Sequence, residues 1–154
     1  LYIDGTGVTT ATIVGLRMLH GDSYGSGGGG IYIYNGTVIL RNNQVVSNTD
    51  SLSLQSGGGI YVRQGDVTLI GNTLQGNMAW SGGAVFVNGG TVALEGNTIA
   101  RNAATRGCGV YVGGGSVNLS SNTIISNTND QLNNRSGGGG VLGQRESPGV
   151  DTRV

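Results

Sequence analysis

The feature that most constrains this chain is an internal repeat with a period of 25 to 31 residues. The block Gly-Gly-Gly-Ile-Tyr-Val at residues 57–62 recurs in related form at 28–33, 82–87 and 107–112, and more weakly at 138–141. A second block, Gly-Asn-Thr-Leu-Gln-Gly-Asn at 71–77, has copies at 42–48, 96–102 and 121–127. Such a period is typical of a solenoid, in which each coil buries its apolar face against the next coil.

Within each copy, apolar and polar residues alternate with a period of two, which indicates strands rather than helices. We expect three short strands per coil, stacked in register into three parallel sheets with right-handed crossovers. The chain is therefore predicted to be an all-β, right-handed parallel β-helix of about five coils. Residues 1–143 would form this single domain, and residues 144–154, which include the only proline, a loose C-terminal tail.

Four files of aliphatic residues are predicted to face the core. The first file contains Leu1, Ile31, Ile60, Val85, Val110 and Val141, and the second contains Ile3, Ile33, Val62, Val87 and Val112. The third contains Ile13, Leu40, Leu69, Leu94 and Leu119, and the fourth Met18, Val45, Leu74, Ile99 and Ile124. Burial of each side chain contributes about 1.5–3 kcal/mol, so these files make a sufficient core.

Two rows of asparagine share this register, and we interpret them as hydrogen-bonding ladders that stabilise the corners. They contain Asn43, Asn72, Asn97 and Asn122, and Asn48, Asn77, Asn102 and Asn127. In the first coil Leu16 and Gly21 take the two positions. Asn also tolerates left-handed backbone, which suits a corner.

Charge excludes several classes of partner. The chain has eight acidic and eight basic residues, a net charge of zero and no lysine. It therefore offers no basic patch for nucleic acid or for anionic lipid. No apolar run approaches the roughly 20 residues of a membrane-spanning helix, so membrane insertion is not expected. Cys108, the only cysteine, can form no internal disulfide and is expected to fill a site that takes glycine in other coils.

No group of residues resembles a catalytic centre, and neither a metal ion nor another cofactor is predicted. Polysaccharide-active β-helices cluster carboxylates on one sheet, for acid–base work or for Ca²⁺. Here Asp22, Asp50 and Asp130 fall at one corner but on different coils, and His20 is the only histidine. We expect His20 to be an exposed loop residue.

An aromatic row is the best candidate for binding. Its members occupy equivalent outward positions on successive coils: Tyr2, Tyr32, Tyr61, Phe86 and Tyr111. With coils about 4.8 Å apart, an exposed stripe of these rings suits flat sugar or protein surfaces. The alternative is that the rings stack on one another and shield the sheet. Trp80 falls at the corner with the longer loops, where it would cap the glycine turns or join a contact surface.

The repeats resemble those of bacterial surface proteins of the polymorphic outer membrane protein type. Gly82-Gly83-Ala84-Val85 matches their Gly-Gly-Ala-aliphatic motif, and Ile99-Ala100-Arg101-Asn102 matches their second motif with an aliphatic residue in place of the usual Phe. The resemblance covers residues 10–143. It implies the β-helix fold, an extracellular or cell-surface location, and a rigid stalk or adhesin-like module that binds carbohydrate or cell-surface protein. The alternatives are a polysaccharide lyase or glycoside hydrolase, and a filament unit that self-associates end to end.

Overall fold

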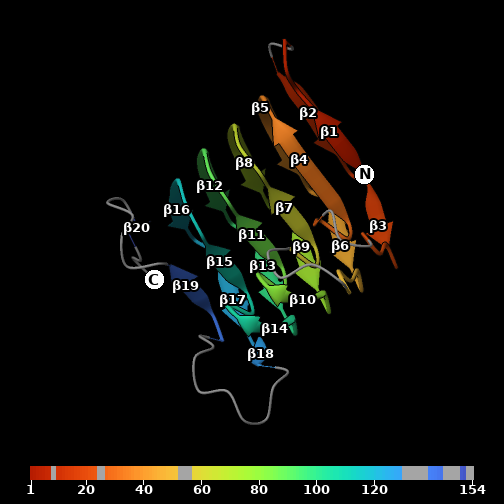
Figure 1. Cartoon of the computed structure of the whole chain (residues 1–154), viewed down its shortest axis with the longest axis vertical. Coiled ribbons are helices and arrows are strands. Elements are labelled where there is room, and N and C mark those ends of the chain that lie inside the picture. The colour runs from red at the N-terminus through yellow and green to blue at the C-terminus, as the bar shows by residue number, and fades with distance from the viewer. Residues whose placement is uncertain (8–9, 24–26, 52–56, 130–138, 144–149, 152–154) are drawn as a thin grey trace.

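The computed structural model shows a parallel β-helix, and it describes residues 1–7, 10–23, 27–51, 57–129, 139–143 and 150–151. Short strands of successive coils lie side by side along the molecule (Figure 1). Every strand pair in the described residues is parallel, as a wound chain requires. None of the described residues belongs to a helix that could cross a membrane.

Four sheets run along the solenoid. The first contains β1 (Tyr2–Asp4), β4 (Ile31–Asn35), β7 (Ile60–Val62), β11 (Val85–Val87), β15 (Val110–Val112) and β19 (Val141–Gly143). The second contains β2 (Ala11–Val14), β5 (Thr37–Arg41), β8 (Asp66–Ile70), β12 (Thr91–Glu95), β16 (Ser116–Ser120) and β20 (Val150–Asp151). The third contains β3 (Arg17–Leu19), β6 (Gln44–Val46), β9 (Thr73–Gln75), β13 (Thr98–Ala100) and β17 (Thr123–Ile125).

The fourth sheet is short and was not predicted from the sequence. It contains β10 (Met78–Ser81), β14 (Ala103–Arg106) and β18 (Thr128–Asn129). Its inward positions hold the small residues Ala79 and Ala104, so these strands lack the aliphatic alternation that marked the other three.

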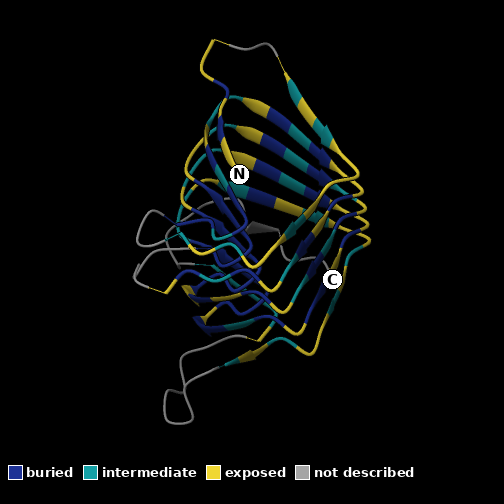
Figure 2. Ribbon diagram, turned by 90° about the vertical axis from the view of Figure 1, so that its right-hand side faces the viewer, coloured by how far each residue is buried: buried dark blue, intermediate teal, exposed yellow. Residues whose placement is uncertain are grey.

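The predicted files are confirmed by the strand pairings, with Leu1 as the exception described below. Ile60 pairs with Val85, and Val85 with Val110, so the three lie in one vertical file. The second-sheet and third-sheet strands keep the same registers. Buried residues alternate with less buried ones along the strands (Figure 2). These files make one continuous core.

The core residues are less buried in the first coil than in the middle coils. Leu1 was predicted to head the first file, but its residue surface is 53% exposed, so this assignment to the core is wrong. Ile13 and Met18 are only partly buried. In the described residues no earlier coil covers them, and burial in a solenoid depends on a neighbour on both sides.

The C-terminal tail lies largely outside the described residues. Val150 and Asp151 are the exception, because they form β20 and pair in parallel with Val117 and Asn118 of β16. The second sheet therefore extends one strand beyond the fifth coil.

The corners depend on left-handed backbone just before each ladder position. The φ angle is positive at Gly15, Asn42, Gly71, Gly96 and Ser121, which precede the first ladder. It is also positive at His20, Ser47, Gly76, Arg101 and Ser126, which precede the second. The sequence suggested that the ladder asparagines themselves tolerate left-handed corners, but the residue before each of them adopts that conformation.

Each inner ladder asparagine, such as Asn72 and Asn77, uses its side chain on both neighbouring coils. Asn72 accepts hydrogen bonds at Oδ1 from the backbone N and Nδ2 of Asn43, at 2.9 and 3.1 Å. Its own Nδ2 donates to the carbonyl of Leu40 at 2.8 Å and to Oδ1 of Asn97 at 3.0 Å. Asn77 repeats this pattern in the second ladder. The ladders therefore satisfy the backbone groups that the corners bury, and their predicted role is confirmed.

We expect Gly96→Ala to lower the free energy of unfolding by about 1 kcal/mol, because left-handed backbone costs an L-residue about 1–2 kcal/mol. At Gly96 φ is +61°, and an added Cβ would meet no atom within 4 Å, so the substitution isolates the backbone cost. Ser121 has φ 54° at the equivalent corner of the next coil, and Ser121→Gly should change stability in the opposite direction. Urea unfolding followed by circular dichroism measures both. Equal losses from the two substitutions would contradict this account.

Candidate binding site

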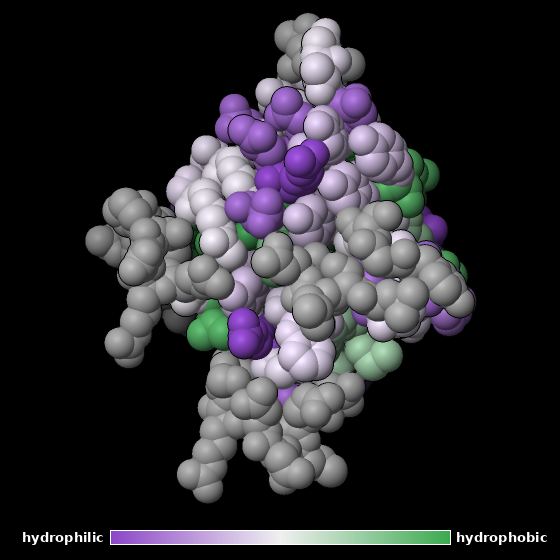
Figure 3. Space-filling model, viewed as in Figure 1, coloured by the Kyte–Doolittle hydropathy of each residue, from purple (hydrophilic) through white to green (hydrophobic). Residues whose placement is uncertain are grey.

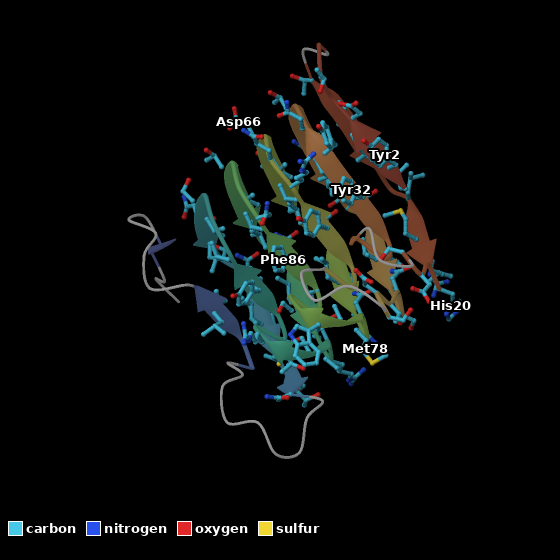
Figure 4. The ribbon with its side chains drawn as sticks, in the orientation of Figure 1. Tyr2, His20, Tyr32, Asp66, Met78 and Phe86 are labelled. Carbon is cyan, nitrogen blue, oxygen red and sulfur yellow. The ribbon has the colours of Figure 1, made fainter. Side chains whose placement is uncertain are left out.

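The aromatic row forms a continuous stack along the first sheet. Tyr2, Tyr32 and Phe86 follow one line down this face (Figure 4). Neighbouring ring centroids from Tyr2 to Tyr111 are 5.4, 5.1, 5.3 and 5.1 Å apart, with interplanar angles of 10–28°. These distances fall in the range of attractive aromatic pairs. The predicted alignment of the five residues is therefore present.

Most of the row is not an exposed stripe, because the structure shows the alternative in which the rings stack on one another and are shielded. Tyr61, Phe86 and Tyr111 are 8, 2 and 5% exposed, and they form a second apolar cluster outside the main core. Tyr32 is partly buried, and Tyr2 is 63% exposed. Only the N-terminal end of the row therefore presents ring surface to a ligand.

Glycine turns lie against the buried rings. A Cβ on Gly27 would lie 2.9 Å from Cδ2 of Tyr61, and one on Gly113 would lie 3.2 Å from Cζ of Phe86. Backbone without side chains can therefore approach the rings closely. Burial is also the main cause that raises the pKa of Tyr61 above its ordinary value, so its hydroxyl stays protonated at neutral pH.

A hollow of about 450 Å³ opens at the exposed end of the row. Its lining combines aromatic rings, glycine backbone and one carboxylate: Leu1, Tyr2, Asp22, Ser23, Gly27, Gly28, Gly29, Tyr32 and Tyr34. We call this the tyrosine hollow. On the face seen in Figure 3, hydrophilic and pale residues predominate and hydrophobic colour lies mainly at the margin. The hollow itself combines aromatic walls with a few polar groups.

Tyr34 and Arg63 extend the aromatic wall. The Arg63 guanidinium carbon lies 4.6 Å from the centroid of the Tyr34 ring, a cation–π distance. A hydrogen bond with the Tyr34 side chain is the main cause that raises the pKa of Arg63. This pair fixes Tyr34, which is 37% exposed.

Asp22 supplies the polar group of the hollow. The hydroxyl of Ser51 donates to both of its carboxylate oxygens at 3.1 Å, and Asp22 also forms a parallel bridge with Thr49. These contacts orient a carboxylate that can accept further hydrogen bonds from hydroxyl groups.

Tyr2 lines the hollow from β1, and Asp4 lies two residues further along the same strand. Partial desolvation, followed by the nearby charge of Asp4, raises the pKa of Tyr2, so its phenol remains a donor and an acceptor at neutral pH. Hydrogen bonds from the side chain and backbone of Thr6 lower the pKa of Asp4, and the Thr6 backbone N lies 3.0 Å from its Oδ1.

The remaining candidates do not converge. His20 is exposed, as expected, and lies at a left-handed corner. Asp50 is 4% exposed, and Asp130 lies outside the described residues. Trp80 is 39% exposed on β10, away from the tyrosine hollow. Among the described residues, no three His, Cys, Asp or Glu side chains gather into a group that could hold a metal ion.

Cys108 occupies the position that Gly58 and Gly83 take in preceding coils. It is 0% exposed, and its Sγ lies 3.2 Å from the carbonyl of Ala104. Burial raises the pKa of its thiol, so less of the thiol is present as the reactive thiolate.

The sequence analysis missed Tyr34, Arg63 and the contribution of Asp22 to this site. One signal was available, because Tyr32 and Tyr34 give β4 two outward aromatic residues where the other first-sheet strands have at most one. The strand pattern could not predict that Asp22 lies beside Tyr2 and Tyr32. That position depends on how the backbone turns at the corner that contains Asp22.

Comparison with known proteins supports the architecture. No curated protein and no solved structure matches the chain. The model of the family described as "Right handed beta helix region" matches residues 1–150. This match covers nearly the whole solenoid, and it agrees with the predicted right-handed winding. The chain belongs to the right-handed β-helix family.

Proposed function

We propose that this chain is a non-catalytic β-helix module of an extracellular or cell-surface protein, and that it binds glycans at the tyrosine hollow. The observation that carries the proposal is the juxtaposition of Tyr2, Tyr32 and Tyr34 with the carboxylate of Asp22 in one open hollow. Sugar rings present flat C–H faces and peripheral hydroxyls. An aromatic wall fits the faces, and an oriented carboxylate accepts hydrogen bonds from the hydroxyls.

The rigid solenoid suits such a role. Successive coils hold Tyr2 and Tyr32 at a centroid distance of 5.4 Å. On its other face the Tyr32 ring stacks on Tyr61, which belongs to the buried part of the row. Tyr side chains provide contact area with little conformational entropy to lose on binding. The site is therefore preorganised, which reduces the entropic cost of binding.

We expect Tyr2→Ser and Tyr34→Ser each to weaken glycan binding at least tenfold, because each removes one aromatic wall and about 1.4 kcal/mol of binding energy corresponds to a factor of ten. A glycan array identifies ligands of the wild-type chain, and calorimetry with the best of them gives the dissociation constants. Circular dichroism checks that the fold is retained, which we expect because Tyr2 and Tyr34 are exposed.

Trp80→Ser is the matched control, since Trp80 is similarly exposed but does not line the hollow. It should leave binding unchanged. If the wild-type chain binds no glycan on the array, or if Trp80→Ser weakens binding as much as Tyr2→Ser does, the proposal is wrong.

A further inference from the structure

Only Asn35 and Asn88, among the asparagines of this chain, are followed by glycine. In such a pair the backbone nitrogen of the glycine can attack the side-chain amide carbon of the asparagine and close a five-membered imide. Glycine hinders this ring closure least, because it has no Cβ and its backbone adopts many conformations. The two pairs share this local chemistry, so any difference between them in the folded chain comes from the structure around them.

The Asn88–Gly89 pair lies at the corner between β11 and β12. Asn88 is exposed, and its side chain has no hydrogen bond to any residue that the structure describes. Its backbone N donates to the carbonyl of Val62 at 2.8 Å, which fixes the start of the corner. Among the described residues, none accepts from the N–H of Gly89 and none donates to the carbonyl of Asn88. This peptide group can therefore rotate without losing a hydrogen bond.

The Asn35–Gly36 pair is enclosed at the same corner two coils earlier. Asn35 is partly buried, and its carbonyl accepts from the N of Gly5 at 2.9 Å. The carbonyl of Gly36 accepts from the N of Asp66 at 3.0 Å, so the neighbouring coils bind the pair from both sides. A Cβ on Gly65 would lie 2.9 Å from the N of Gly36. The nitrogen that would attack is therefore covered by backbone.

The ladder asparagines are hydrogen-bonded at both reacting groups, as Asn97 illustrates. The nitrogen that would attack belongs to Thr98, and its N–H donates to the carbonyl of Asn72 at 2.9 Å. The Nδ2 that would leave donates to the carbonyl of Leu69 and to Oδ1 of Asn122. Ring closure at a ladder position therefore requires the corner to open first.

We propose that Asn88 is a site of spontaneous deamidation. The Gly89 nitrogen, after its proton has passed to hydroxide, attacks Cγ of Asn88 and forms the new C–N bond of the imide. The bond between Cγ and Nδ2 breaks, and Nδ2 leaves as ammonia with a proton taken from water. Water then opens the imide at either of its two carbonyls. One opening gives aspartate, and the other gives isoaspartate, in which the main chain runs through the side-chain carbons.

The two products affect the corner differently. Aspartate adds a negative charge at an exposed position and leaves the length of the main chain unchanged. Isoaspartate adds one carbon to the main chain just before Gly89. The coils are in close contact there, because a Cβ on Gly90 would lie 2.1 Å from the carbonyl oxygen of Gly65, and the N of Thr91 donates to that same oxygen at 2.9 Å. The longer main chain must displace this contact, so the isoaspartate form is the less stable product.

The test incubates the full chain in mildly alkaline buffer, once folded and once in urea, and follows each asparagine by mass spectrometry of proteolytic peptides. In the folded chain we expect Asn88 to react at least tenfold faster than Asn35, because Asn35 reacts only after local opening. In urea the two should react at similar rates. Gly89→Ala should slow the reaction at Asn88 at least tenfold in the folded chain, with the fold checked by circular dichroism.

Equal rates at Asn35 and Asn88 in the folded chain, or a rate difference that persists in urea, would overturn the proposal. Faster reaction at a ladder asparagine would do the same, as would an unchanged rate in Gly89→Ala. So would a folded chain in which Asn88 stays intact for a time in which it reacts in urea.

Urea unfolding of the incubated chain tests the second product. Asn88→Asp reproduces the charge of the aspartate form without the longer main chain, so it is the matched control. The incubated chain should unfold at a lower urea concentration than Asn88→Asp does. Equal unfolding midpoints would contradict the distortion expected of isoaspartate at this corner.

Discussion

Replacing Asn72 with alanine is expected to lower the free energy of unfolding by about 4 kcal/mol, since each buried polar group left without a partner costs about 1–3 kcal/mol. The substitution removes four side-chain hydrogen bonds and leaves the buried backbone N–H of Asn43 without its acceptor. The other three lost bonds add about 0.5–1.5 kcal/mol each. Asn72 is 1% exposed, so water cannot replace it without opening the corner. Such a loss is a large part of the 5–15 kcal/mol that stabilises a typical domain.

Urea unfolding followed by circular dichroism measures the effect of Asn72→Ala. Asn118→Ala is the control, because Asn118 is an exposed residue of the second sheet outside both ladders; it should change stability by less than about 0.5 kcal/mol. A loss below about 1 kcal/mol for Asn72→Ala would mean that the corners do not depend on the ladders.

The sequence predicted the register of the solenoid well, because two independent periodicities agree. The repeat fixes which residues are equivalent, and the period-two alternation fixes which of them face inward. Ile60, Val85 and Val110 had to share a file once both were known, and the pairings show that they do. The ladder positions followed from the same register, including the substitutions Leu16 and Gly21.

The exposure of outward residues was predicted less well, because strand alternation says nothing about what lies over a sheet. Phe86 points away from the main core, yet neighbouring rings and a glycine turn bury it. The tyrosine hollow likewise depends on where Asp22 comes back beside Tyr2. That path is set by the corner backbone, which carries no periodic signal. The extracellular location and the choice of ligand remain proposals for the same reason, since a repeat specifies a shape and not a partner.

The buried aromatic stack should contribute to stability as a core does, although it lies outside the main core. Phe86→Ala is expected to lower the free energy of unfolding by about 3 kcal/mol, at the low end of the 3–5 kcal/mol for a buried Phe. Phe86 is 2% exposed and stacks on Tyr61 and Tyr111 at 5.3 and 5.1 Å, so the substitution removes contacts on both ring faces and leaves a cavity.

Tyr2→Ala supplies the comparison within the same row. Tyr2 stacks on one neighbour only and is 63% exposed, so its loss should cost less than about 1 kcal/mol. Urea unfolding of both variants tests the difference. If Phe86→Ala costs as little as Tyr2→Ala, the middle of the row is open to solvent, and the binding surface extends along the whole first sheet. If the two costs differ as expected, the enclosed rings stabilise the solenoid and Tyr2 contributes little to stability, which is what the proposed binding role of Tyr2 requires.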